Sequence, residues 1–127
     1  MRPVLVDTDV FINFLRGKPA AKEFLVAQLE EGPIFCSVIT IAEIVAGMRP
    51  HEKEKTKALL NNLEVVDVNL AIAEKAGHYK GSIKSHALEL DDCLIAATAH
   101  VRKLTLATCN GRHYPMDDVL KVVVACE

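Results

Sequence analysis

Short runs of apolar residues alternate along the chain with longer segments in which apolar residues recur at helical spacing. The short runs predict five strands, at residues 4–6, 34–36, 64–68, 104–107 and 121–124. The segments between them predict helices at residues 10–15, 19–30, 38–48, 52–63, 69–84 and 89–101. Strands that are apolar at consecutive positions are typical of a parallel sheet with both faces covered. We therefore predict one three-layer α/β/α domain over residues 1–127, with a central, mainly parallel sheet of about five strands.

Two of the predicted helices have informative ends or faces. Thr8 or Asp9 can cap the helix at residues 10–15, since short polar side chains accept hydrogen bonds from the first free N–H groups. The helix at residues 52–63 is charged and amphipathic, and we expect Ala58, Leu59 and Leu63 to form its inner face.

Composition agrees with an ordinary globular domain. Half of the 127 residues are apolar and a quarter are charged, so the chain can build a full core, chiefly from aliphatic side chains because Trp is absent. The net charge of −2 excludes a protein that holds nucleic acid by bulk positive charge, although a nuclease with a local basic rim stays possible. No apolar run approaches the roughly 20 residues that span a bilayer. We therefore expect a cytoplasmic protein.

The four cysteines do not form a recognisable metal motif. They stand at positions 36, 93, 109 and 126, and none of them is part of a Cys-x-x-Cys pair. Three lie within apolar stretches, where a thiol behaves as a small hydrophobic group. We expect reduced, buried thiols.

Acidic residues stand at the edges of the most apolar segments. Asp7 follows the first strand, Glu43 lies inside an apolar helix, and Asp91 and Asp92 open the last helix. Thr108 follows another strand, and the carboxyl ends of parallel strands meet along one edge of a sheet. A carboxylate is costly to bury unless it is paired or bound to a cation. We therefore expect an oxygen-ligand site for a hard metal ion, of the kind that serves phosphate chemistry.

Most of these acids also have a purely structural interpretation. Asp9 could be only an N-cap, and Asp91 could serve only the dipole of its helix. Glu43 could lie exposed on a helix flank. Asp92 begins a stripe at helical spacing with Ile95, so it should point towards the core, where a charge needs a partner.

Four blocks in a fixed order carry a resemblance to a known family. An Asp-Thr step precedes an apolar pair in the first block, and a Glu lies in an apolar helix ahead of Gly in the second. An Asp precedes an Ile-Ala-Ala run in the third block, and Thr-x-Asn precedes a His and an aromatic residue in the fourth. The blocks cover residues 6–12, 39–47, 92–99 and 106–114. Together they resemble PIN domains, most closely the VapC ribonuclease toxins of toxin–antitoxin pairs, from residue 4 to about residue 124.

The resemblance implies an endoribonuclease that depends on Mg²⁺ or Mn²⁺. The family's acids correspond to Asp7, Glu43 and Asp92, which would hold the metal and form the catalytic cluster. Asn110 stands where many relatives have a fourth acid, which leaves the number of bound ions open. Asn110 could still donate an oxygen or orient a water.

Other residues could support this cluster or bind RNA. Supporting roles are expected for three residues next to the acids, namely Thr108, Asp91 and Asp9. Thr108 could hydrogen-bond a neighbouring carboxylate. Phosphate contacts are expected from Arg112, His113 and Arg49, although each could instead be an ordinary solvated surface residue.

The resemblance also implies protein partners. VapC-like proteins are generally homodimers that a small VapB-like antitoxin inhibits. The stretch Pro19–Leu29 and the helix after Pro50 are candidates for a groove that receives an antitoxin helix.

Three alternatives compete with a ribonuclease. Asp7-Thr8-Asp9-Val10 matches the nucleophile motif of haloacid-dehalogenase-like phosphatases, but their later acids should follow a strand, whereas Asp91 opens a predicted helix. A phosphoacceptor receiver domain would leave Glu43 without a role. A catalytically inactive PIN scaffold that only binds RNA or protein is the third, and Asn110 favours it.

Overall fold

A five-stranded sheet, parallel throughout, forms the middle layer of the molecule. The computed structural model describes residues 3–84 and 87–126. The strands are β1 (Val4–Val6), β2 (Ile34–Ser37), β3 (Leu63–Val66), β4 (Thr105–Thr108) and β5 (Lys121–Val123). Their order across the sheet is β3-β2-β1-β4-β5, and every neighbouring pair is parallel. The predicted number of strands and their direction are confirmed.

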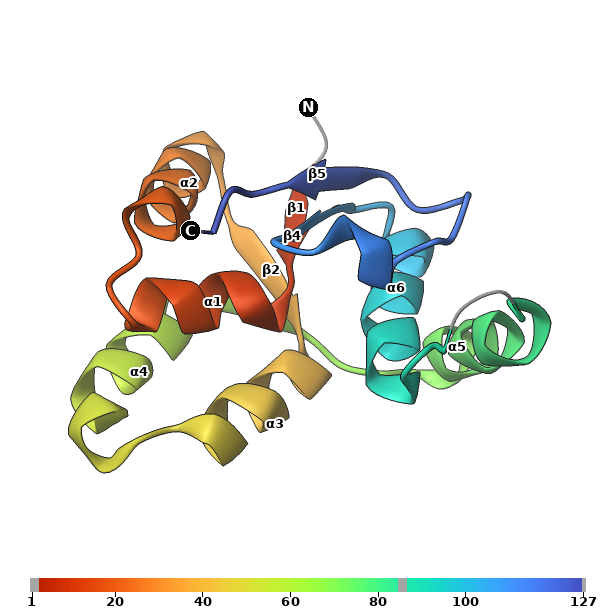
Figure 1. The fold of residues 1–127 in the computed structure, drawn as a ribbon, viewed down its shortest axis with the longest axis horizontal. Helices are drawn as coiled ribbons and strands as arrows, with labels where there is room; N and C mark the ends of the chain where they lie inside the picture. The colour runs from red at the N-terminus through yellow and green to blue at the C-terminus, as the bar shows by residue number, and fades with distance from the viewer. Residues whose placement is uncertain (1–2, 85–86, 127) are drawn as a thin grey trace.

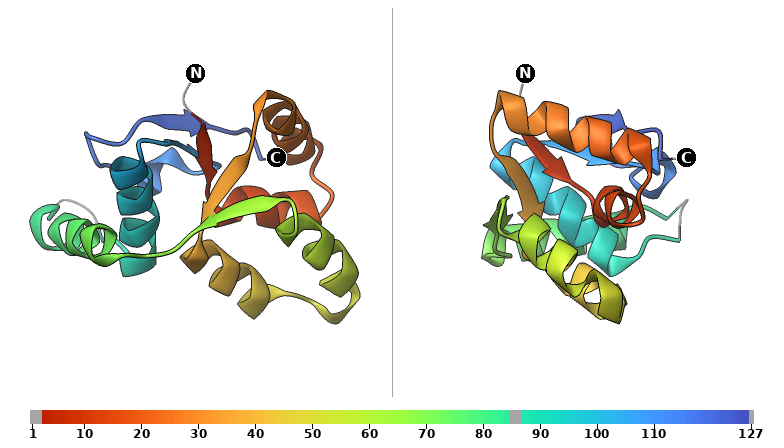
Figure 2. Two further views of the ribbon diagram at one scale, coloured as in Figure 1. Left: turned by 180° about the vertical axis from the view of Figure 1, so that it is seen from behind. Right: turned by 90° about the vertical axis from the view of Figure 1, so that its left-hand side faces the viewer.

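Helices cover both faces of this sheet. They are α1 (Thr8–Leu15), α2 (Pro19–Glu31), α3 (Val38–Gly47), α4 (Lys53–Leu60), α5 (Leu70–Ser82) and α6 (Leu90–Arg102), with short 3₁₀ helices η1 (Pro50–Glu52) and η2 (Gly111–His113). Figure 1 shows α1, α2 and α4 on one side of the strands and α5 and α6 on the other. The reverse view in Figure 2 shows β3, in yellow-green, beside β2 at the edge of the sheet. Across the described ranges, we find no helix with the length and apolar character that crossing a membrane requires.

Two expectations about the helices are wrong. The N-cap of α1 is Asp7 rather than Thr8 or Asp9, because the Asp7 carboxylate accepts the Thr8 backbone N–H at 2.8 Å. The helix expected at residues 52–63 ends at Leu60, and Leu63 instead pairs with Ile34 in the sheet. Ala58 is exposed, so the inner face of α4 is formed by Leu59 and its neighbours.

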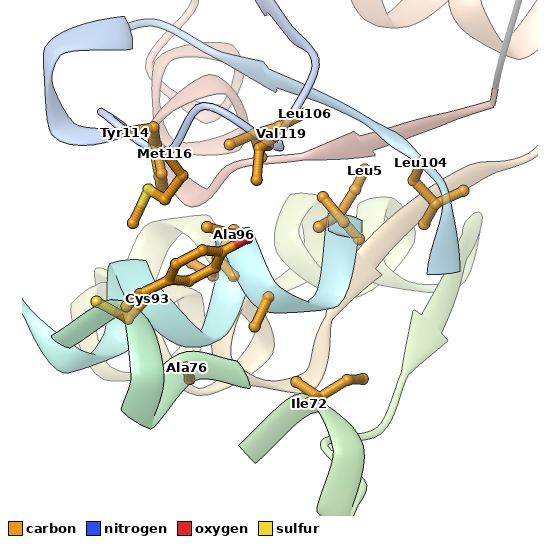
Figure 3. Packing of buried hydrophobic residues seen from close by; sticks show 14 of the residues in the cluster. Leu5, Ile72, Ala76, Cys93, Ala96, Leu104, Leu106, Tyr114, Met116 and Val119 are labelled. Atoms are coloured by element: carbon orange, nitrogen blue, oxygen red, sulfur yellow. The ribbon is translucent and has the colours of Figure 1, made fainter. Parts of the chain in front are cut away.

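Alternation along β1 divides the core into two parts. Leu5 points towards α5 and α6, whereas Val4 and Val6 point towards α1 and α2. All three side chains are essentially inaccessible to solvent. Figure 3 shows the α6 side, where Leu5 and Leu106 lie across from Ala96. The residue after β1 is therefore held between two packed layers, which makes its position rigid.

The expectation for the cysteines is wrong for two of the four. Cys36 and Cys93 are buried free thiols, but Cys109 and Cys126 form a disulfide with a Cα–Cα distance of 5.6 Å. The reason is the pairing of β4 with β5, which brings the segments that follow these strands side by side at the carboxyl edge. A separation of 17 residues does not reveal this pairing.

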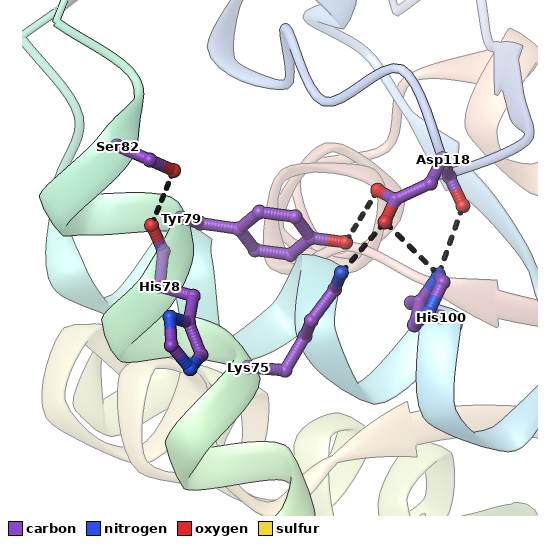
Figure 4. Close-up of polar contacts among 6 residues, drawn as sticks. All are labelled: Lys75, His78, Tyr79, Ser82, His100 and Asp118. Carbon is purple, nitrogen blue, oxygen red and sulfur yellow. Dashed lines mark hydrogen bonds and ion pairs between the residues drawn. The ribbon is translucent and has the colours of Figure 1, made fainter.

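A polar network joins α5, α6 and the loop before β5 (Figure 4). The Asp118 carboxylate accepts a hydrogen bond from the Tyr79 hydroxyl at 2.7 Å and pairs with the Lys75 ammonium at 2.7 Å. The His100 ring lies 3.0 Å from the Asp118 carbonyl oxygen. These partners hold the pKa of Asp118 below its usual value despite its partial desolvation. The network therefore anchors the loop that leads into β5.

Candidate active site

The strand order places a topological switch point between β1 and β4 at the carboxyl edge of the sheet. From β1 the chain moves outwards through β2 to β3, and it then returns to the other side of β1 to form β4 and β5. The connections at the carboxyl ends of β1 and β4 therefore diverge, as they do where ligands bind in open parallel sheets. Asp7 directly follows β1, and Thr108 is the last residue of β4.

Asp7 is a buried carboxylate with a full set of donors. Its Oδ1 accepts the Thr8 backbone N–H at 2.8 Å, and its Oδ2 accepts the Thr108 hydroxyl at 2.8 Å. Its side chain is only 5% exposed. Burial and, secondarily, the charge of Asp9 raise the pKa of Asp7 to about 6, although the donors oppose this rise. The site therefore strongly disfavours negative charge at Asp7 when no cation is present.

Asp9 lies near Asp7 and places a second negative charge beside it. The Asp9 Oδ1 accepts the Cys109 backbone N–H at 3.2 Å, and its Oδ2 lies 3.3 Å from the Thr108 hydroxyl. Thr108 also accepts the Asn110 backbone N–H at 3.1 Å. Thr108 thus contacts both carboxyl groups, and Asp9 is placed by β4 rather than serving as a helix cap.

Glu43 extends from α3 to Thr8, at the start of α1. Its Oε1 accepts the Thr8 hydroxyl at 2.6 Å, and this hydroxyl also lies 3.0 Å from that of Thr40, which is fully buried. The pKa of Glu43 is raised to about 7, first by burial, then by a hydrogen bond and charge from Asp91, and last by the charge of Asp7. The Thr8 hydrogen bond opposes this rise. Glu43 is therefore a carboxyl group that can exchange a proton near neutral pH.

Asp91 and Asp92 lie in the first turn of α6, in agreement with the helix predicted at residues 89–101. The Asp91 carboxylate accepts the Asp92 backbone N–H at 3.0 Å. The pKa of Asp92 is raised by burial and by the charge of Asp91, while the His113 ring and the Tyr114 hydroxyl favour its charged form. The Tyr114 hydroxyl lies 3.4 Å from Asp92 Oδ1.

Asn110 caps the short helix η2. Its side-chain oxygen accepts the Arg112 backbone N–H at 3.3 Å, and its amide nitrogen lies 3.1 Å from the His113 ring. The side chains of Arg112 and His113 are exposed. Arg49 is also exposed and lies between α3 and η1, where its backbone N–H donates to Glu52 at 2.9 Å.

The donor set of this site fits a hard divalent cation. The available ligands are carboxylate oxygens, which Mg²⁺ prefers, and two of the carboxyl groups resist ionisation without a counter-charge. Across residues 3–84 and 87–126, no three His, Cys, Asp or Glu side chains converge closely enough to hold an ion together. At most two of these side chains could therefore share one ion in this structure, and Mg²⁺ can bind through one or two carboxylates while it keeps several waters.

Comparison with known proteins identifies the family. A sequence model of the PIN domain family matches residues 4–119. The chain belongs to the PIN domain family. It is 42% identical over 120 residues to ribonuclease VapC10 of Mycobacterium tuberculosis, which covers 93% of this chain and 90% of that protein.

Two solved structures resemble this PIN domain in fold. The first is a toxin–antitoxin complex from Klebsiella pneumoniae, with 27% identity, a TM-score of 0.74, and coverage of 92% of this chain and 95% of that one. The second is VapBC2 from Rickettsia felis bound to a promoter DNA fragment, with 19% identity, a TM-score of 0.84, and coverage of 95% and 98%. The predicted three-layer fold and the VapC resemblance are confirmed.

The sequence pattern identified several contacts of this PIN domain and missed others. The expected hydrogen bond from Thr108 to a neighbouring carboxylate is present. Sequence reasoning missed Tyr114, and it also missed Thr8 as the partner of Glu43. In the sequence, Tyr114 stands only as the aromatic residue that ends the fourth block. Its hydroxyl is the signal that indicates a polar role for this residue.

Proposed function

We propose that this PIN domain is an endoribonuclease that depends on Mg²⁺ or Mn²⁺ and that residues 1–127 act as one domain. The observation that carries the proposal is the set of carboxyl groups at the switch point between β1 and β4. Asp7 and Glu43 both have raised pKa values there, and each is raised partly by other acids of the site. Such mutual repulsion supports a resident cation. The similarity to ribonuclease VapC10 supports RNA as the substrate.

Asp7 and Asp92 are the proposed metal ligands, with Glu43 completing the cluster. A divalent ion held there would supply positive charge at the scissile phosphate and would make water a better nucleophile. Thr108 orients Asp7 through the 2.8 Å hydrogen bond to its Oδ2. Asn110 is proposed to contribute through its side-chain amide, next to His113. Asp9 and Asp91 are proposed to support the cluster by adding negative charge.

Glu43 is the proposed proton acceptor. Because its pKa is about 7, Glu43 can be protonated or charged at physiological pH. The Thr8 hydroxyl holds Oε1 at 2.6 Å, and a hydrogen bond with Asp91 also involves this carboxyl group. A fixed carboxyl group with such a pKa suits general base catalysis.

The substrate would be held by positive charge at the rim. Arg112 and His113 are exposed in η2, directly after Asn110, and His113 is close enough to Asp92 to lower the pKa of that carboxyl. Arg49 is a further proposed phosphate contact. Because the chain has a net charge of −2, RNA binding must depend on such local groups.

A small VapB-like antitoxin is the proposed protein partner. An apolar groove lies between α2 and α4, and its lining includes Phe14, Leu25, Val26, Leu29, Leu59 and Leu63. Val26 and Leu29 are about half exposed, so the groove presents apolar surface that an amphipathic helix could cover. The similar Klebsiella pneumoniae structure is a toxin–antitoxin complex. We also propose a homodimer, and light scattering of the purified protein would test it.

The proposed activity is tested by incubating RNA with purified, antitoxin-free protein and Mg²⁺ or Mn²⁺. The variants Asp7→Asn and Asp92→Asn should lose metal-dependent cleavage. Asp117→Asn, an exposed acid in the loop before β5, is the matched control and should cleave like the unmodified protein. Cleavage that survives in both site variants, or that persists in EDTA, would refute the assignment. A folded protein without any cleavage would favour a PIN scaffold that only binds.

A further inference from the structure

A buried tyrosine contacts one of the acids of the proposed site. Tyr114 follows η2, and its side chain is fully buried in the core cluster between the sheet and α6. Figure 3 shows Tyr114 beside Met116, on the side of the sheet that faces α6. Its hydroxyl therefore approaches the carboxylates from the packed interior and not from solvent.

The Tyr114 hydroxyl contacts a carboxylate that belongs to a different element. It lies 3.4 Å from Oδ1 of Asp92, in the first turn of α6. It is also near enough to Asp7, after β1, to favour the charged form of that carboxyl. The phenol is therefore a neutral donor to Asp92, close to a second acid of the proposed site.

The chemistry of a buried phenol suits this position. Burial raises the pKa of Tyr114, and the charges of Asp7 and Asp92 raise it further, so the group stays protonated and remains a donor. A donor to a carboxylate limits the orientations that the carboxylate can adopt. Hydrogen bonds of this kind to metal ligands typically contribute about 10–100-fold to metal affinity or activity.

We propose that Tyr114 is a positioning residue whose hydroxyl orients Asp92 for binding of a divalent cation. This inference rests on the proposed metal-dependent function. The fold needs an aromatic ring at this position to fill the core, and phenylalanine would supply it equally well. The hydroxyl is therefore the group that serves the site.

The test compares Tyr114→Phe with Tyr79→Phe in the full-length, metal-free protein. Both changes remove one hydroxyl from a buried ring of the same core cluster, but the Tyr79 hydroxyl donates to Asp118, outside the acidic site. Binding of Mn²⁺ is measured by calorimetry. We expect Tyr114→Phe to weaken Mn²⁺ binding about 10-fold, at the low end of the usual range because the 3.4 Å contact is long. Tyr79→Phe should bind Mn²⁺ like the unmodified protein.

Two results would overturn the proposal, and they differ in meaning. Unchanged Mn²⁺ affinity in Tyr114→Phe, with normal binding by the unmodified protein, would assign the hydroxyl to the core alone and leave the proposed function intact. Absence of Mn²⁺ binding by the unmodified protein would remove both proposals together. An equal loss of affinity in both tyrosine variants would indicate a general loss of packing and would also contradict the assignment.

A second measurement needs no substitution at Tyr114. The chain has two tyrosines, so 3-fluorotyrosine labelling yields two fluorine signals, and Tyr79→Phe assigns them. On titration with Mg²⁺ the Tyr114 signal should shift in the unmodified protein and stay unchanged in Asp7→Asn. A Tyr114 signal that does not move when Mg²⁺ saturates the protein would refute the proposal.

Discussion

Replacing Asp7 with Asn should make the metal-free protein more stable at neutral and higher pH. The carboxylate is nearly inaccessible to solvent and faces other acids, and its pKa is raised from 3.8 to about 6. An acid whose pKa is raised by folding binds protons more tightly in the folded state. Stability therefore falls as pH rises from about 4 through 6, and the loss is complete above that range.

The size of the stability change follows from the pKa shift of Asp7. A rise from 3.8 to about 6 corresponds to about 3 kcal/mol of lost folding stability at pH 8, at 1.36 kcal/mol per pKa unit. The Asn amide keeps an acceptor for the Thr8 backbone N–H and can donate to the Thr108 oxygen, so most of the hydrogen bonding survives. Allowing for poorer geometry, we expect a net gain of about 2 kcal/mol, or about 8 °C in Tm for a chain of this size.

Urea unfolding in EDTA at pH 8 and at pH 4 measures this difference, with Asp117→Asn as the control for removal of an exposed charge. The advantage of Asp7→Asn should be present at pH 8 and nearly absent at pH 4. Adding Mg²⁺ at pH 8 should stabilise the unmodified protein and not the variant, because only the unmodified site keeps the full charge. An equal advantage at both pH values, or none at pH 8, would show that charge burial at Asp7 is not responsible.

Three further outcomes are expected. Glu43→Gln should reduce RNA cleavage at least about 100-fold and should abolish any dependence of the rate on a group with a pKa near 7, as a pH–rate profile would show; an unchanged profile would assign that group elsewhere. Reduction of Cys109–Cys126, which closes a segment of 17 residues, should lower stability by about 3 kcal/mol in denaturant titrations, and Cys126→Ser should then be insensitive to reductant. Asp118→Ala should cost about 1 kcal/mol at pH 7, and this cost should shrink as pH falls from 3.8 through the lowered pKa of the carboxyl group, whereas a loss that persists in full in acid would exclude its ion pair with Lys75 as the cause.

Much of the fold follows from local features of the sequence. Apolar runs such as Val4–Val6 predict buried parallel strands, and the segments between them have the spacing of amphipathic helices. Because parallel strands end at one edge, the sequence alone also indicated that Asp7 and Thr108 lie close together, and their hydrogen bond agrees with this. These inferences succeed because the spacing of apolar residues and the residue types reflect interactions between residues that are close together in the sequence.

Other features depended on strand order and packing, which local patterns do not encode. The pairing of β4 with β5 brings Cys109 to Cys126, and only the packing of the segment after η2 against α6 brings Tyr114 to Asp92. The α4 helix ends early because Leu63 is paired in the sheet beside Ile34, an interaction between residues far apart in the chain. Local pattern therefore determined which residues form each element and where acids stand along the chain. Tertiary structure decided which side chains meet, because those contacts depend on interactions between distant segments.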